Sequence, residues 1–287
     1  MPRHILILLF IVATLLQKVS ATQVDDDDFW LLLDYQEPLQ NALWLYGGLD
    51  ELDGSYYGGS ADLALLDALH FNFTLTEQNY EVETIDLRWG FSGAINRNFS
   101  WSVLKKFWGK KEALEKNDLA FSLSYFYRRF NLRGAYETGD VELFLRDIPI
   151  IRRDSVSTDH RAWEISAGYS WPVFYTQLSY KAHDYDRDLS VIARRPRLFL
   201  SFDTVGIQQA GALADYEASI LLGARAGSMV YELYLTRIKS AVFEDLNTYA
   251  TVHLARSLSR SFELGLDFEL PVNNVPFSAG LTLGIMW

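Results

Sequence analysis

The amino-acid sequence predicts an all-β protein, namely an antiparallel transmembrane β-barrel of about 14 strands. Three features support this prediction: apolar residues alternate with small or polar ones along most of the chain, the sequence opens with a segment typical of exported proteins, and the final alternating segment ends on an aromatic residue. Beyond the first segment no run of about 18 apolar residues occurs, which excludes a helical membrane protein.

The composition is that of a packed or membrane-embedded protein. The 287 residues are 49% hydrophobic and 15% aromatic, which is too apolar for a disordered chain. The chain has no cysteine, so we expect no disulfide scaffold. The formal net charge of -11 disfavours a nucleic-acid partner, which would be bound through its phosphates.

Residues 1–21 have the features of a secretory signal peptide. An apolar run from Ile5 to Leu16 follows Arg3, and it is shorter than the roughly 20 residues that span a bilayer. Val19 and Ala21 are the small residues expected before a cleavage site. Cleavage after Ala21 would leave 24 basic and 37 acidic side chains, a net charge of -13. An acidic leader at residues 22–40 would then precede the barrel at residues 41–287.

Five segments show the alternation most clearly, and each is predicted to be a strand with one apolar and one polar face. They are residues 69–76, 119–127, 162–171, 261–270 and 277–287. A soluble β-sandwich also alternates, but here aromatic residues gather beside turns, as in the interfacial girdle of a membrane barrel. These aromatic residues are Phe99, Trp101, Trp171, Phe174, Phe262 and Trp287.

Short connections alternate with long ones, as expected of a barrel with turns on the periplasmic side and loops on the other. The six short connections lie near Asp67 and at residues 93–98, 128–131, 171–172, 224–227 and 257–261. The seven longer ones lie at 50–57, 77–83, 109–118, 148–160, 184–215, 240–246 and 271–276, which gives 14 strands. Two regions leave 12 or 16 strands open: residues 29–66, which alternate irregularly around Trp44, and residues 194–210, where Leu198, Leu200 and Phe202 could form a further strand.

The C-terminal segment resembles that of Gram-negative outer-membrane β-barrel proteins, because Trp287 is an aromatic residue that closes its own alternating strand. The resemblance implies an outer-membrane location, porin-like architecture, and insertion by the barrel assembly machinery with Trp287 as the assembly signal. That family also favours a glycine five places before the end, where this sequence has Thr282. Outer-membrane lipid and lipopolysaccharide are the expected surroundings. Arginines of the long loops would meet lipopolysaccharide phosphates or be solvated; they are Arg152, Arg153, Arg187, Arg194, Arg195 and Arg197.

Motifs of enzymatic barrels are absent, so we predict no enzyme, no cofactor and no metal site. No G-x-S-x-G motif occurs, and no histidine has a serine two residues later, as in the phospholipase and deacylase barrels. The neighbours Asp159 and His160, and likewise His183 and Asp184, could suggest catalytic pairs, but adjacent residues of a strand point to opposite faces. The run Asp25–Asp28 lacks the glycine and spaced oxygen ligands of a calcium loop, so we interpret it as an exposed leader.

The polar face of the strands is predicted to line a water-filled lumen. Charged side chains in a closed interior are costly without water or ion pairs, and a plugged or salt-bridged interior is the alternative. The predicted lumen-lining acidic residues are Asp62, Asp86, Glu137, Glu164, Glu217, Glu232, Glu263, Asp267 and Glu269. The predicted basic ones are Arg88, Arg133 and Lys181, together with Arg128 and Arg225.

The predicted function is passive diffusion of small hydrophilic solutes through an outer-membrane channel. A weak preference for cations is expected, because five of the lumen carboxylates fall on the last five strands and only Arg225 opposes them. A non-conducting structural or interaction barrel at the cell surface, including one linked to polysaccharide export, is the alternative. An enzyme at the extracellular rim is a further hypothesis.

Overall fold

A computed structural model describes residues 41–51, 54–66, 68–79, 83–110, 113–144, 155–194, 209–210, 212–270, 272 and 277–287. The predicted signal peptide and acidic leader lie outside these residues. So do Arg152, Arg153, Arg195, Arg197 and the suggested strand around Leu198, Leu200 and Phe202.

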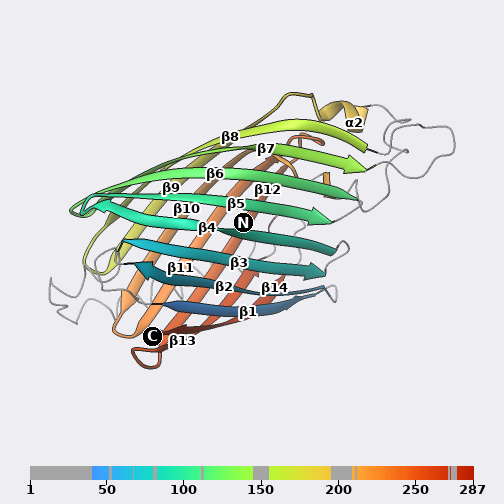
Figure 1. The fold of residues 1–287 in the computed structure, drawn as a ribbon. Helices are drawn as coiled ribbons and strands as arrows, with labels where there is room; N and C mark the ends of the chain where they lie inside the picture. Colours follow the sequence, from blue (N-terminus) through green and yellow to red (C-terminus); the bar gives the residue numbers. More distant parts are fainter. Residues whose placement is uncertain are drawn as a thin grey trace.

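The described chain forms a closed barrel of 14 antiparallel strands, which confirms the predicted fold and strand number (Figure 1). The strands are β1 (Ala42–Asp50), β2 (Ser55–Leu66), β3 (Leu69–Asn79), β4 (Glu83–Asn96), β5 (Phe99–Lys110), β6 (Leu114–Tyr127), β7 (Phe130–Phe144), β8 (Ser155–Ser170), β9 (Phe174–Tyr185), β10 (Ala214–Ala226), β11 (Met229–Ser240), β12 (Leu246–Ser257), β13 (Phe262–Leu270) and β14 (Ser278–Met286). One short helix, α2 (Ser190–Arg194), lies between β9 and β10.

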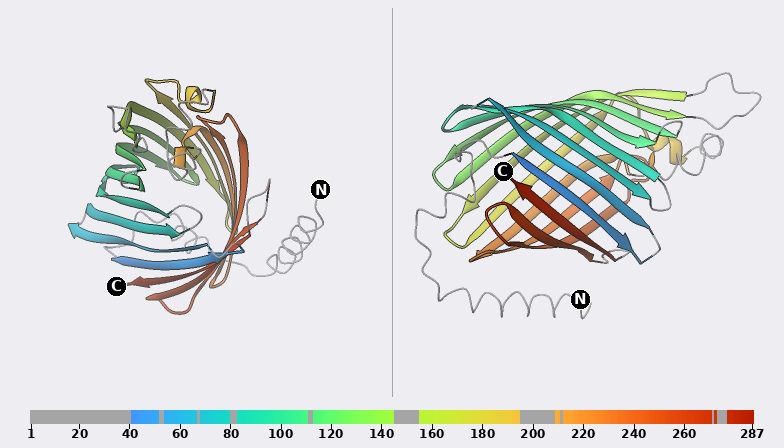
Figure 2. Two further views of the ribbon diagram at one scale, coloured as in Figure 1. Left: turned by 90° about the vertical axis from the view of Figure 1, so that its right-hand side faces the viewer. Right: turned by 60° about the horizontal axis from the view of Figure 1, so that its bottom comes forward.

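Pairing of the first and last strands closes the barrel. Leu45 of β1 lies opposite Leu283 of β14, and the backbones of Asn41 and Trp287 exchange two hydrogen bonds of 3.0 Å. Every strand therefore has two neighbours, and the barrel has no open edge (Figure 2). The six short turns lie at the end that carries residues 41 and 287, here called the turn end, and the longer connections lie at the loop end.

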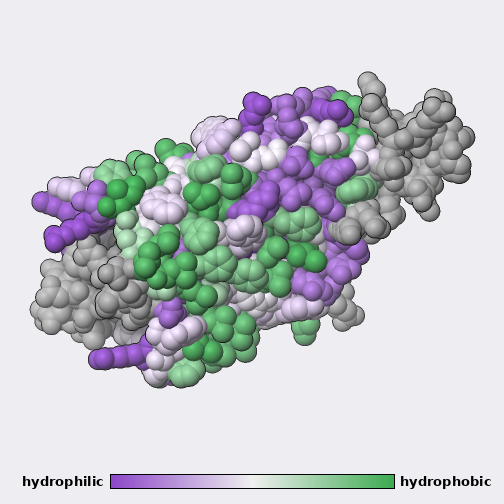
Figure 3. All heavy atoms as spheres, viewed as in Figure 1, coloured by the Kyte–Doolittle hydropathy of each residue, from purple (hydrophilic) through white to green (hydrophobic). Residues whose placement is uncertain are grey.

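The register turns one face of every strand outward, and these outer faces are apolar. Leu45, Phe73, Phe121, Ile165 and Leu281 are among the large hydrophobic side chains exposed on the outside. Figure 3 shows apolar side chains spread over the barrel wall, with hydrophilic ones gathered toward the loop end of β6–β8. A soluble protein rarely exposes so large an apolar surface, whereas a barrel embedded in lipid requires one. The outer surface is therefore that of a transmembrane barrel.

Aromatic side chains mark the turn end of this apolar surface. The rings of Phe99 and Tyr125 lie 4.9 Å apart, and those of Tyr169 and Trp171 lie 4.7 Å apart. Phe174, the first residue of β9, is exposed at the same end. This is the arrangement of an interfacial girdle, where aromatic rings lie at the level of the lipid headgroups.

The irregular region 29–66 contains β1 and β2 from residue 42 onward. Leu45 points outward as usual, but Trp44, Tyr46 and Tyr56 occupy inward positions. The alternation was irregular because the inward residues are aromatic instead of small or polar.

Six of the seven predicted loops include strand residues, and the overlap is largest at two of them. Residues 109–118 include the end of β5 and the start of β6, and residues 148–160 include the first residues of β8. The strands β6, β7 and β8 have 14, 15 and 16 residues, whereas β1, β13 and β14 have 9 each. On the long strands the outward residues near the loop end are polar, so the apolar pattern stops before the strand does.

The described parts of the connection between β9 and β10, residues 186–194, 209–210 and 212–213, pack at the loop end of the barrel. Leu189 and Ile192 join an apolar cluster with Leu114 and Val141 of the barrel wall, and these four side chains are buried. Farther along the segment, the Gln209 amide donates a 3.2 Å hydrogen bond to the backbone oxygen of Glu83 in β4. These described residues thus contact β4, β6 and β7. Within the described chain, no helix is long and apolar enough to cross a bilayer.

Candidate functional site

The register places all twelve predicted lumen-lining residues on the inward face of the barrel. Glu164 of β8 faces Lys181 of β9, which in turn faces Glu217 of β10. The same alternation of inward and outward residues continues around the barrel. Arg225 also takes an inward position on β10. The prediction that Arg128 lines the lumen is wrong. Arg128 lies in the β6–β7 turn with φ 53°, and its guanidinium carbon lies 5.4 Å from the centre of the Tyr127 ring. Since Tyr127 is exposed on the outside, Arg128 belongs to the turn-end rim.

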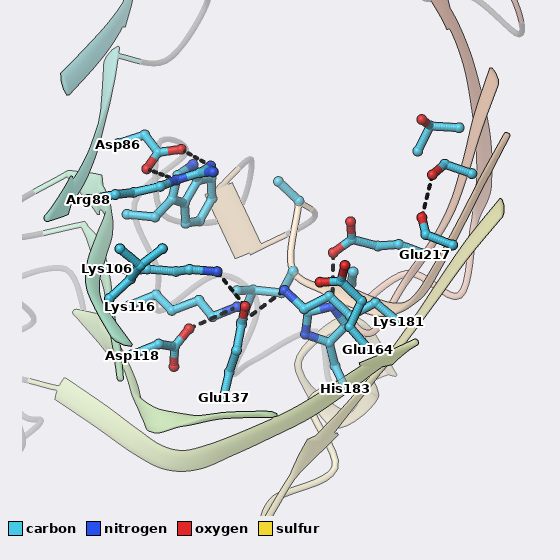
Figure 4. Close-up of a pocket in the computed structure, with 18 of the residues that line it drawn as sticks. Asp86, Arg88, Lys106, Lys116, Asp118, Glu137, Glu164, Lys181, His183 and Glu217 are labelled. Carbon is cyan, nitrogen blue, oxygen red and sulfur yellow. Dashed lines mark hydrogen bonds and ion pairs between the residues drawn. The ribbon is translucent and has the colours of Figure 1, made fainter. Parts of the chain in front are cut away.

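An interior cavity of about 540 Å³ lies between the wall strands β4–β11 (Figure 4). Opposite charges line it in close pairs. Arg88 donates to Asp86 at 2.9 and 2.5 Å, and Arg133 donates to Glu164 at 3.1 Å. Predicted acidic and basic residues thus form ion pairs here, which makes this part of the interior nearly neutral.

Glu137 lies in the middle of the paired charges. Its carboxylate accepts hydrogen bonds from Lys106 of β5 and from Lys181 of β9, the latter at 2.9 Å. The inward residues opposite it on β6 and β8 are Ala120 and Ala162. Because these side chains are small, lysines two strands away on either side can reach the same carboxylate. The ion pairs therefore link five consecutive strands.

A chain of four side chains crosses the strands next to this cluster. Asp118 bonds to His160 Nδ1 at 2.8 Å, His160 Nε2 bonds to His183 Nδ1 at 2.9 Å, and His183 Nε2 bonds to Glu217 at 2.9 Å. Lys116 lies 3.4 Å from the other oxygen of Asp118. His160 is fully buried.

The three hydrogen bonds of this chain require three protons. Two neutral imidazoles carry one proton each, and an ionised carboxylate carries none. A chain that forms all three hydrogen bonds would bind one proton more than two neutral imidazoles supply. Its net charge would then be -1 instead of -2, which would lower the cost of burial.

The sequence alone relates His160 and His183 only to their neighbours in the chain. Asp159 and Asp184 do point outward, away from His160 and His183, as the strand geometry predicts. The true partners are Asp118 and Glu217, which come from other strands. The sequence did not predict that Asp118, His160 and Lys116 line the lumen, because they lay in segments assigned to loops. Their positions in the alternation of inward and outward residues could have revealed them.

Carboxylates without lysine or arginine partners line the remaining wall, formed by β11–β14 and β1–β3. Asp267 bonds to His253 and to the Thr282 hydroxyl, each at 2.7 Å, and Asp62 bonds to His70 at 2.7 Å. Among the described residues of these seven strands, no lysine or arginine takes an inward position. The interior thus has one charge-balanced side and one acidic side, and the acidic side also includes Glu232, Glu263 and Glu269.

Trp287 lies at the junction of the first and last strands. Its side chain is exposed on the outside, and its backbone pairs with Asn41. A role in assembly stays a prediction.

No protein-family model and no curated protein matches the sequence. Solved structures with a similar fold are outer-membrane proteins. The CymD monoaromatic hydrocarbon channel has a TM-score of 0.49 and 10% identity, with 88% of each chain covered. The KdgM porin has a TM-score of 0.43 and 8% identity, covering 86% of this chain and 99% of its own. An OmpT loop-deletion variant from Vibrio cholerae has a TM-score of 0.45 and 8% identity, covering 87% and 98%. At such scores the fold assignment rests on the strand pairing described above, and the likeness carries no argument about function.

Proposed function

We propose that this protein is an outer-membrane channel of a Gram-negative bacterium through which small hydrophilic solutes diffuse, with a weak preference for cations. It carries out no reaction in this proposal and needs no cofactor. Outer-membrane lipid and lipopolysaccharide surround it, and the barrel assembly machinery inserts it by way of the strand that ends at Trp287.

The access of interior charges to water carries this proposal. The side chains of Arg88, Arg133 and Asp62 are 50%, 41% and 47% exposed although they point into the barrel. Glu217 is 36% exposed beside the buried His183. A plug formed by the described residues would have covered these groups. Charges that keep this much access indicate a hydrated passage, since water satisfies them without further partners.

The separation of charge inside the barrel supports the cation preference. Ion pairs balance the side formed by β4–β9, whereas the carboxylates on β11–β14 bond mainly to hydroxyl groups and imidazoles. A wall with one sign of charge raises the local concentration of counter-ions. Cations should therefore enter more readily than anions.

Recording from single barrels in a planar bilayer tests this proposal. The purified protein should give discrete conductance steps, and a KCl gradient should give a reversal potential of the sign set by K⁺. Protein that inserts and migrates as a folded barrel on an unheated gel, yet gives no steps, would overturn the channel.

One observation favours a second candidate, a non-conducting interaction barrel. The apolar cluster around Leu189 and Ile192 and the hydrogen bond from Gln209 to Glu83 narrow the loop-end mouth. If they seal it, the loops would serve surface contacts instead of transport. The same recording separates the two functions.

A further inference from the structure

A column of aromatic rings lines the acidic side of the interior. Trp44 and Tyr46 occupy inward positions two residues apart on β1, and Tyr56 of β2 faces the next inward position, Gly48. A strand rises about 3.3 Å per residue, so successive rings are spaced by roughly 7 Å along the wall. The column runs from the turn end toward the loop end.

Each of these rings lies flat against the wall because a glycine lies under it. A β-carbon on Gly284 would lie 2.2 Å from the Trp44 ring, one on Gly58 would lie 2.7 Å from the Tyr46 ring, and one on Gly48 would lie 2.6 Å from the Tyr56 ring. The Tyr46 hydroxyl continues across β2 to the Thr76 hydroxyl, 2.6 Å away on β3. One face of each ring thus packs against the backbone of the wall, and the other face is turned to the lumen.

A column of carboxylates runs beside the rings. On β13, Glu263 lies opposite Gly284, Asp267 opposite Gly280, and Glu269 opposite Ser278. The Trp44 ring covers Gly284, and the Tyr56 ring reaches Gly280, where a β-carbon would lie 2.0 Å from its hydroxyl. The Trp44 ring therefore lies beside Glu263, and the hydroxyl end of the Tyr56 ring lies beside Asp267.

The chemistry of this wall fits one class of ligand. The face of an aromatic ring attracts a cation, most strongly when the cation has apolar groups that shed water easily. The carboxylates beside the rings bond only to uncharged hydroxyl groups or to imidazole, in the contacts of Glu263 with Ser257, Asp267 with Thr282 and His253, and Glu269 with Ser278. Their charge is not offset by lysine or arginine in this part of the described wall.

We infer that the aromatic column of Trp44, Tyr46 and Tyr56, with the carboxylates of β13, is a binding path for small organic cations, namely substituted ammonium ions. This inference rests on the proposed function, since it names the class of solute that the channel would favour. Neutral sugars also stack on aromatic rings, and they are the competing outcome of the test.

The test compares choline with its uncharged isostere 3,3-dimethyl-1-butanol and with glucose. Binding to the folded barrel is measured by ligand-observed NMR, in a detergent that has no choline headgroup. Choline should bind at least about tenfold more tightly than the isostere, because only the charge differs. Equal affinities for choline and the isostere, or tighter binding of glucose, would overturn the inference.

Matched variants locate the site. Trp44→Leu with Tyr46→Leu, and separately Glu263→Gln with Asp267→Asn and Glu269→Gln, should each weaken choline binding about tenfold. The variant Trp44→Leu with Tyr46→Phe keeps the second ring, so it should bind choline more tightly than Trp44→Leu with Tyr46→Leu. Trp163→Leu and Asp140→Asn with Asp159→Asn alter only outward residues and should leave it unchanged.

Folding and conduction are followed separately. Each variant must migrate as a folded barrel on an unheated gel before it is compared. A folded double leucine variant that binds choline like the unmodified protein would overturn the inference. Because binding is measured without current, a barrel that binds choline but conducts no ions would overturn only the proposed channel.

Discussion

Glu137 is where a single substitution should have the largest effect on stability. Its side chain is 3% exposed and forms ion pairs with both Lys106 and Lys181. Glu137→Gln leaves two neighbouring ammonium groups without their carboxylate, and removal of one partner from a buried ion pair costs about 3–5 kcal/mol. We expect the free energy of unfolding by urea to fall by about 3 kcal/mol, the lower end of this range, because both lysines keep some access to water.

The comparison for this prediction is Glu164→Gln. The Arg133 partner of Glu164 is 41% exposed, so the pair is worth less than about 1 kcal/mol. Tryptophan fluorescence of the barrel in lipid vesicles reports unfolding of both variants. Equal losses would show that Glu137 is not the centre of the network.

The proton count of the histidine chain gives a second prediction. In Glu217→Gln, the glutamine amide can donate to His183 Nε2, so all three hydrogen bonds form with two neutral imidazoles. We expect the ¹⁵N spectrum of labelled histidine to show a doubly protonated imidazole in the unmodified protein and to lose it in this variant. The control Asp62→Asn alters only the separate pair with His70. Identical spectra for His160 and His183 in the unmodified protein and Glu217→Gln would contradict the proton count.

At the level of the strand, the sequence predicted which face a residue occupies but not which residues meet. The alternation of inward and outward residues is a property of each strand by itself, so it predicts that Glu137 and Lys181 point inward without identifying their partners. Their contact depends on the register of three strands and on the small Ala162 between them, which no single segment reveals. The alternation also failed to predict strands where the inward residues are aromatic, as at Trp44. It failed as well where the outward residues are polar, as at the start of β8.

The closing strand pair is the element whose disruption should impair assembly most. Deleting Trp287 removes the last backbone pair between β14 and Asn41 and the aromatic end of the strand. We expect a lower yield of heat-modifiable barrel in the outer membrane than for the full chain. Deletion of Asp25–Asp28 is the control. Similar yields from both deletions would argue against an assembly role for this end.

Helix α2 offers a prediction about the mouth. Leu189→Ser with Ile192→Ser weakens the apolar cluster that holds this helix against the wall. Burying a hydroxyl without a partner is unfavourable, so the segment should pack less closely and the single-channel conductance should rise. Arg194→Gln, which removes an exposed ion pair with Glu244, should not alter it. Unchanged conductance in the double variant would mean that α2 does not restrict the passage.

For the whole molecule, charge inside the barrel should govern selectivity more than net charge does. Loop charges are screened within about 8 Å at physiological ionic strength, whereas lumen charges act on every ion that passes. Glu232→Gln with Glu263→Gln and Asp267→Asn should shift the reversal potential in a KCl gradient toward zero. Neutralising Asp25–Asp28 should change it little. An anion-selective unmodified pore, or a triple variant with unmoved reversal potential, would contradict the cation preference.

The unequal strand lengths give the barrel a slanted rim. The strands β6–β8 exceed β1, β13 and β14 by five to seven residues, about 16–23 Å along the strand. Their outward residues near the loop end are polar, and hydrophilic side chains gather there (Figure 3). The longer side, with its polar outer residues, would stand in water, while the shorter side would end closer to the lipid headgroups. In the proposed channel, a solute that moves along the membrane surface would therefore meet the opening on the shorter side. The interior wall on that side carries the carboxylates of β13 and the rings of β1 and β2, so the slanted rim would bring solutes first to the acidic half of the interior.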